Sequence, residues 1–432
     1  MKEHCHEQRS EDTCGPADAG RGGAGSGGAI PGTGPPRTGT PPATTRRASG
    51  RASPPLRQRK RRTLTLRTEL GLVKLATDYG QDPQTRQWFC PQQRAWGLTP
   101  HQKITPGLAD KLCFTAVATT SYEQAAAVAA RWGVTVDDAV IHQQVQRAGE
   151  RADQQAEARV AARTSPPTSA PRPATDALVI MMDGWMLRQR GPDWGLQPTD
   201  AAGERVMWQE CKSAVIYRLA QGVTTKNDRG LLVEKFVVAY HGDPLEFGRR
   251  VQAEARRRGL GQVPQVFVVA DGGVWIWNIV ADRFASATGV LDFYHASQHL
   301  WAVAHTLHPD HAAGAKAWVE PLLHQLRHGG ETAVLQTLHD LPAWCAQRAQ
   351  PMPPTLATET QYFEKHRDHL HYEARAAEGC PVGSGAMESF CAQLQGRFKR
   401  CGQFWSAPGR RRLMALEIAR RNHDWLQLWR LN

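Results

Sequence analysis

The stretch ALVIMMDGWM, residues 177–186, is an apolar run that leads into Asp183 and Gly184. A second stretch, QVFVVADGGVWIW (residues 265–277), has the same construction and leads into Asp271. Such continuous apolar runs are typical of strands buried on both faces in the centre of an α/β sheet. If the two strands are neighbours, their ends deliver both aspartates to the same edge of that sheet.

Further β-type runs surround these two strands. They lie at residues 207–219, 235–242 and 289–292, and amphipathic helical patterns separate the later ones. The resulting order, β-β-β-α-β-α-β, predicts an α/β fold with a mixed sheet flanked by helices. The pattern at about residues 296–378 is helical throughout and is interpreted as an all-helical insertion. We therefore expect residues 176–432 to form one catalytic domain.

The N-terminal third divides into a tail, a helical region and a linker. Residues 1–62 are basic and rich in Gly and Pro, which predicts disorder; they are either a nucleic-acid-binding arm or a solvated leader. Residues 63–163 are predicted to be a separate helical DNA-binding region, and residues 164–175 a Pro-rich linker. Within residues 120–149, two helical patterns meet at a glycine turn, which gives a helix-turn-helix outline; an ordinary helical hairpin is the alternative.

The composition favours a polyanionic partner. The 432-residue chain has a formal net charge of +12 at pH 7 and much more arginine than lysine. Arginine binds phosphate in a planar bidentate geometry, although a GC-rich genome would also enrich it. The nine cysteines show no CxxC or CxH spacing, which predicts reduced thiols. Without an apolar run of about 18 residues or an apolar signal region, we expect a cytoplasmic protein with no membrane partner.

A third carboxylate stands out in PVGSGAMESFCAQLQGRFKR, residues 381–400, where Glu388 is the single acidic residue. Two strand-end aspartates and one helical glutamate suit a pair of Mg²⁺ ions, which stabilise the attacking and leaving oxygens of a phosphodiester. Lys399, eleven residues past Glu388 and so about three helical turns away, could reach phosphate from the same face. Each acid also has a simpler interpretation: Asp before Gly forms turns, and Glu in a first turn caps helices.

The motifs DGWM at Asp183, VADGGVWIW at Asp271, DFYHASQHL from Asp292 and GSGAMESFCAQLQGRFKRCGQFWS (residues 383–406) carry a resemblance. Together they resemble the DDE transposases of bacterial insertion sequences, in the branch with an all-helical insertion and kinship to Mutator-like elements. The resemblance covers roughly residues 63–430. Relatives often have a Cys-pair zinc ribbon before the helical region, whereas WFCPQQRAWGL (residues 88–98) keeps a single cysteine.

The resemblance implies an RNase H-like mixed sheet with catalytic and metal-binding Asp183, Asp271 and Glu388. It implies Mg²⁺ or Mn²⁺ as cofactor, with two ions. It further implies DNA as partner, both element ends and target, and a homo-oligomer in synapsis. The family's Asp-x-x-His motif matches Asp292 and His295, so His295 is a fourth catalytic candidate, with helix capping as its alternative role. The expected DNA-binding residues are Arg397, Lys399, Arg400, Trp405, Arg410, Arg411 and Arg412.

The sequence thus predicts a DNA transposase that cleaves and joins DNA strands and has no small-molecule substrate. Two other functions stay open: a domesticated sequence-specific DNA-binding protein, and a non-transposing RNase H-like nuclease.

Overall fold

The structure is a computed structural model in which residues 56–99, 102–162, 176–197, 203–224, 226 and 230–430 are described. All of them belong to one compact unit, Pro54–Asn432. The predicted linker and the predicted tail up to residue 55 lie outside the described residues.

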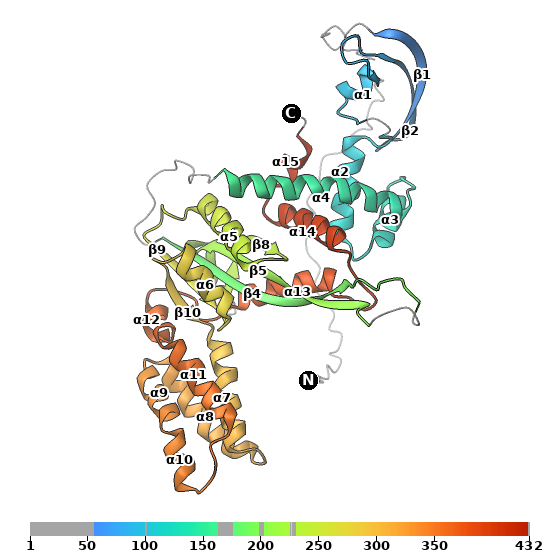
Figure 1. Ribbon diagram of the computed structural model, residues 1–432. Helices are drawn as coiled ribbons and strands as arrows, with labels where there is room; N and C mark the ends of the chain where they lie inside the picture. Colours follow the sequence, from blue (N-terminus) through green and yellow to red (C-terminus); the bar gives the residue numbers. More distant parts are fainter. Residues whose placement is uncertain are drawn as a thin grey trace, which may run out of the picture. The chain divides into compact units, whose positions relative to one another are not determined.

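A five-stranded mixed sheet has the strand order β10-β9-β4-β5-β8. β4 is parallel to β9 and antiparallel to β5, and β9 is parallel to β10. Helices flank the sheet, so the predicted α/β class and the predicted order of elements are confirmed (Figure 1). The strands are β4 (Ala177–Arg190), β5 (Val206–Arg218), β8 (Phe236–Tyr240), β9 (Gln265–Ala270) and β10 (Thr288–Leu291), with a small hairpin of β6 (Gly222–Thr224) and β7 (Gly230–Leu232) after the 3-10 turn η1 (Leu219–Gln221).

The two faces of the sheet pack against different helices because side chains alternate along each strand. Leu178, Ile180 and Met182 of β4 belong to a core shared with α5 and α6. Val179 and Met181 point the other way, into a core shared with α13 and α14. β4 is therefore buried on both faces, as its unbroken apolar run predicts. The four helices are α5 (Pro244–Arg258), α6 (Val274–Arg283), α13 (Gly385–Phe398) and α14 (Ala407–Arg421).

β4 and β5 continue beyond their other neighbours. The pairing of β4 with β9 ends at Met182 and Ala270, whereas β4 and β5 stay paired out to Arg190 and Val206. We call this two-stranded extension, residues 185–190 with 206–211, the β4–β5 arm (Figure 1). The segment before α14 joins the arm, since the backbone N–H of Arg190 donates to the Trp405 carbonyl at 2.9 Å.

The N-terminal part begins with an antiparallel sheet, which corrects the prediction of an all-helical region from residue 63. Residues 57–62, which the sequence analysis assigns to the tail, form the first half of β1. The stretch TLTLRT (residues 63–68) alternates with period two, which is the pattern of a half-buried strand. The elements here are β1 (Arg57–Thr68), β2 (Gly71–Gln81), β3 (Trp88–Phe89), α1 (Pro91–Ala95), α2 (Pro106–Ala118), α3 (Tyr122–Arg131) and α4 (Asp138–Ala161).

The expected pair of helices around Gly133 is present as α3 and α4. Gly133 has a φ of 82°, a conformation that suits glycine at the end of a helix. The second helix, α4, has Asp137 at its N-cap and continues for 24 residues. α4 also packs along α14. At the contact, a Cβ added to Gly149 would lie 2.4 Å from the Arg412 carbonyl oxygen, so the two backbones approach closely.

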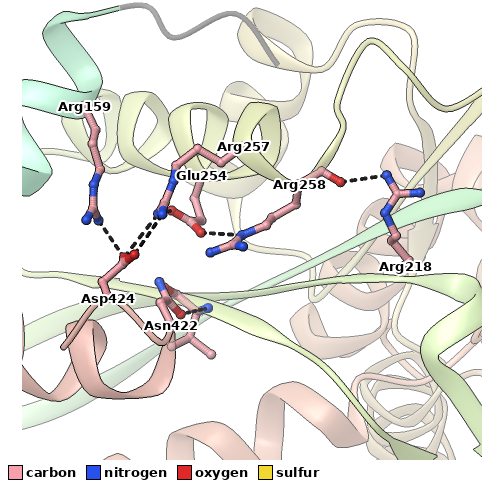
Figure 2. A network of polar contacts seen from close by, with 8 residues as sticks. Arg159, Arg218, Glu254, Arg257, Arg258, Asn422 and Asp424 are labelled. Carbon is pink, nitrogen blue, oxygen red and sulfur yellow. Dashed lines mark hydrogen bonds and ion pairs between the residues drawn. The ribbon is translucent and has the colours of Figure 1, made fainter. Parts of the chain in front are cut away.

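A buried ionic network joins α4, α5 and the C-terminal segment (Figure 2). Asp424, 2% exposed, accepts from Arg159 of α4 and from Arg257 of α5, each at 2.8 Å. Glu254 accepts from Arg257 at 2.6 Å and from Arg258 at 2.8 Å. The network therefore ties the N-terminal helices to the sheet domain through residues far apart in sequence.

The insertion between β10 and α13 is helical, as predicted for residues 296–378. Its first helix, α7 (Phe293–Leu307), starts directly after β10. Among the described residues, none of the helices combines the length and the apolar character needed to cross a membrane. The remaining helices are α8 (Ala312–Arg327), α9 (Glu331–His339), α10 (Leu341–Gln347), α11 (Pro354–Lys365), the 3-10 turn η2 (Arg367–His369), α12 (Tyr372–Ala377) and, at the C-terminus, α15 (Trp425–Trp429).

Candidate active site and nucleic-acid interface

Asp183 and Asp271 lie at the ends of adjacent parallel stretches. Met182 and Ala270 are the last paired residues of β4 and β9, so both aspartates follow at the same edge of the sheet. The backbone N–H of Gly273 donates to the Asp271 Oδ1 at 2.9 Å. The expectation that the two strands are neighbours is therefore confirmed, and it brings the two carboxylates together.

The two carboxylates interact electrostatically. The pKa of Asp183 is raised, first by burial and then by the negative charge of Asp271. The Gly184 N–H, a positive charge on His295 and the thiol of Cys391 each lower that pKa and partly offset the increase. Two acids that repel each other in a partly buried position form a place where a cation would be stabilised.

Glu388 lies in the first turn of α13 and its side chain is exposed. One turn later, the Cys391 Sγ lies 3.7 Å from the Asp183 Oδ2, so α13 contacts β4 at the point where its pairing with β9 ends. Burial raises the pKa of the Cys391 thiol, and the charges of Asp183 and Glu388 add to this increase. In the described ranges, no three or more His, Cys, Asp or Glu side chains are arranged to hold a metal ion.

Asp292 connects the strand end to α13. It is fully buried, and its Oδ1 accepts the backbone N–H groups of Tyr294 and His295 at 2.7 and 3.0 Å, which caps α7. Its Oδ2 accepts the N–H of Ser384, immediately before α13. Asp292 therefore has a positioning role that the sequence did not reveal: it fixes the start of the helix that carries Glu388. His295 is half-buried in the first turn of α7.

The helical insertion packs against the loop that follows β9. A Cβ added to Gly272 would lie 2.2 Å from the Tyr362 ring, so only glycine fits there. The Trp277 Nε1 donates to the Asp271 carbonyl at 2.8 Å, and its ring stacks on His369 at 3.8 Å. The insertion therefore supports the backbone of Asp271 through Trp277 of α6, on which His369 stacks. The sequence predicts the helices of the insertion, but it does not predict that they pack against the loop after β9.

The β4–β5 arm presents an exposed group of cations and aromatic rings. Trp208 is 54% exposed, with the Lys399 Nζ 5.7 Å and the Arg188 guanidinium 6.0 Å from its ring. Arg190 lies 5.1 Å from the ring of Trp194, which is 40% exposed. Cations beside exposed rings suit phosphate contact and base stacking. Of this group, Lys399 was predicted from the sequence as a DNA contact. The alternation of exposed and buried residues along β4 and β5 is the sequence signal that could have identified Arg188 and Trp208.

Two of the expected DNA-binding arginines are buried, which corrects the prediction that they face DNA. Arg397 is 8% exposed and Arg410 is 3% exposed. The physical reason is helical periodicity: each lies three residues from a core leucine, Leu394 in α13 and Leu413 in α14, and so shares its buried face.

The other predicted DNA contacts have varied surroundings. Lys399 follows the last residue of α13 and is exposed, as is Arg400. Arg411 and Arg412 are paired with acids of α4, namely Asp153 at 2.9 Å and Glu150. Trp405 is half-buried, and its Nε1 donates to the Phe398 carbonyl at 2.8 Å.

Comparisons with known proteins give little guidance. No model of a known protein family matches the chain, and neither does any curated protein. One solved structure with a similar chain trace is the Drosophila P element transposase strand transfer complex. It has 10% sequence identity and a TM-score of 0.35, and the match covers 74% of this chain and 93% of that one. Similarity at this level carries no conclusion about function, which has to come from the residues themselves.

Proposed function

We propose that the chain is a metal-dependent DNA transposase with an RNase H-like core, in which Asp183, Asp271 and Glu388 are the catalytic carboxylates. The observation that supports this most is the register of β4 and β9, which places two aspartates at one sheet edge. The resemblance of the four sequence motifs to DDE transposases adds the third acid and the reaction. DNA strand cleavage and strand transfer would take place at this edge.

The acid pair suits a hard divalent cation. Carboxylate oxygens are the ligands that Mg²⁺ and Mn²⁺ prefer, and the mutual repulsion of Asp183 and Asp271 would be relieved by a cation between them. Asp183 and Asp271 would hold the metal, and Glu388 would complete the set from α13. When bound, a pair of such ions stabilises the attacking and leaving oxygens of a phosphodiester.

The chain's own residues would then position the DNA. Lys399 and Arg188 would contact phosphates next to Trp208, whose exposed ring offers a surface for a frayed base. Asp292 would hold the start of α13 so that Glu388 stays beside the strand ends. Positioning and electrostatic stabilisation account for this chemistry without a covalent enzyme intermediate.

The test is strand cleavage and strand joining on duplexes from the gene's own flanks, in Mg²⁺, comparing wild type with Glu388→Gln. Glu320→Gln is a matched control, because Glu320 is exposed on α8 of the insertion. We expect nicking and joining by wild type and by the control, and a loss of about 100-fold or more in Glu388→Gln with DNA binding retained.

The other outcomes identify the alternatives. Sequence-specific binding without cleavage by any of the three proteins would indicate a domesticated DNA-binding protein, and Glu388 would then be a helix-capping residue. Cleavage of unrelated duplexes without joining would indicate a nuclease.

A further inference from the structure

A cavity of about 480 Å³ lies between α4, α5, β8 and α14, apart from the carboxylate site. Volumes of roughly 300 to 1,000 Å³ are typical of small-molecule sites. Apolar and charged side chains both line the cavity, and both kinds determine which ligand it could bind.

Most of the charges around the cavity are balanced within the protein. Asp153 accepts from Arg411 at 2.9 Å and from Arg250 at 3.4 Å. Arg159 is paired with Asp424 at 2.8 Å, in the network of Figure 2. These arginines have carboxylate partners and need no ligand.

Arg410 is different. It lines the cavity and is 3% exposed, yet its hydrogen-bond partners in the described part of the chain are both uncharged. One terminal nitrogen donates to the Gln189 Oε1 at 2.7 Å, the other to the His241 Nδ1 at 2.6 Å, and the buried Nε has no partner. A guanidinium has five N–H donors, so several remain available.

No carboxylate of the described ranges forms an ion pair with Arg410, and the pKa directions agree with this. Burial lowers the pKa of Arg410 to about 10. Burial and the charge of Arg410 lower the pKa of His241 to about 4, so this imidazole is neutral and accepts at Nδ1. Its Nε2 lies 3.1 Å from the Gln209 Oε1. A buried cation held by neutral acceptors is costly unless an anion joins it.

Two further features define the missing group. Arg410 lies in the first turn of α14, where the helix dipole favours negative charge. Beyond it, Val237, Met414 and Ile418 contribute an apolar wall to the same cavity. The wall would be in contact with an apolar body, not with a hydrated inorganic ion.

We propose that this cavity binds a small organic anion, with its oxyanion head group on Arg410 and its apolar body against Val237 and Met414. The site is distinct from the carboxylates of the proposed function and does not depend on them. A bound ligand would connect α14 with β4 through Gln189 and with the end of β8 through His241, the two groups that already hold Arg410.

Calorimetric titration of the full chain with hexyl phosphate, hexanoate, inorganic phosphate and hexanol tests this. We expect saturable binding of one or both hexyl anions, at least tenfold weaker binding of inorganic phosphate, and none of hexanol. Preference between the two hexyl anions identifies the head group as phosphate or carboxylate. Failure of both to bind, or equal binding of hexanol, would overturn the proposal.

Variants locate the site. Arg410→Gln removes the charge, and we expect it to weaken hexyl anion binding at least tenfold. Arg249→Gln is the matched control: this exposed arginine of α5 lies outside the cavity lining and pairs with Glu246 at 3.5 Å, so the variant should bind like wild type. Ala415→Leu narrows the cavity without touching Arg410, so it also weakens binding and replaces Arg410→Gln if that variant does not fold. Unchanged affinity in both variants would place binding elsewhere.

Discussion

Asp183 is a single candidate catalytic residue whose ionised form is unfavourable in the folded protein. Its pKa is raised in the folded protein, so ionising it costs stability. That cost is fully present above the raised pKa and disappears as the pH falls toward the usual range of an aspartate. The ionised form of Asp183, which the proposed metal binding needs, is therefore the form that destabilises the folded protein.

Asp183→Asn is therefore expected to raise the melting temperature at pH 7 while reducing strand cleavage by about 100-fold or more. The stability gain should shrink as the pH is lowered to about 4, where the wild-type carboxyl is also protonated. Thermal unfolding across this pH range measures it. Adding Mg²⁺ should stabilise wild type more than the variant; equal stabilisation would argue against a metal at Asp183.

Single residues also show where prediction from sequence stops. Asp183 and Asp271 could be predicted to meet, because strand-end acids after buried runs have a defined place in an α/β sheet. Arg410 is buried because it lies three residues from Leu413, on the same face of α14. In the sequence, however, the run of arginines at residues 410–412 suggests an exposed surface, and this signal is stronger than the three-residue spacing. The contact of Asp292 with the start of α13 is made through Ser384, 92 residues away, which no local pattern reveals.

At the scale of elements, the five-stranded sheet and the helices α3 and α4 were predicted well, whereas the N-terminal strands β1 and β2 were not. Long apolar runs identify β4 and β9, because a strand that is buried on both faces is apolar at nearly every position. β1 and β2 are partly exposed, and their alternating pattern competes with a dense basic run. The end of β4 beyond residue 186 was missed because it continues past the buried part of the sheet, where apolar character no longer marks a strand.

The contact of α4 with α14 gives a test at this scale. Gly149→Ala would place a Cβ 2.4 Å from the Arg412 carbonyl, so we expect the free energy of unfolding to fall by about 1–3 kcal/mol. Gly396→Ala in α13 is the control: its Cβ has no neighbour within 4 Å, so helix propensity should raise that free energy by about 1 kcal/mol. Urea unfolding compares them; similar effects would mean that α4 and α14 do not pack closely.

At the scale of the whole molecule, Asp424 joins parts that are distant in sequence. Asp424→Ala would leave Arg159 and Arg257 without this buried carboxylate, and we expect a loss of about 3–5 kcal/mol in unfolding free energy. Asp282→Ala serves as control, because that aspartate is 53% exposed and its ion pair is with the adjacent arginine. Chemical denaturation measures both, and an equal effect would contradict a linking role for Asp424.

The contact between Cys391 and Asp183, which spans 208 residues, also has a consequence for synthesis. A ribosome makes the chain from its N-terminus, so the strands carrying both aspartates emerge long before α13 does. A nascent or truncated chain would hold the two acids at an open sheet edge without Glu388 above them. The proposed cutting activity would therefore begin only after α13 has been synthesised and has packed on the sheet, which ties DNA cleavage to a late step of folding.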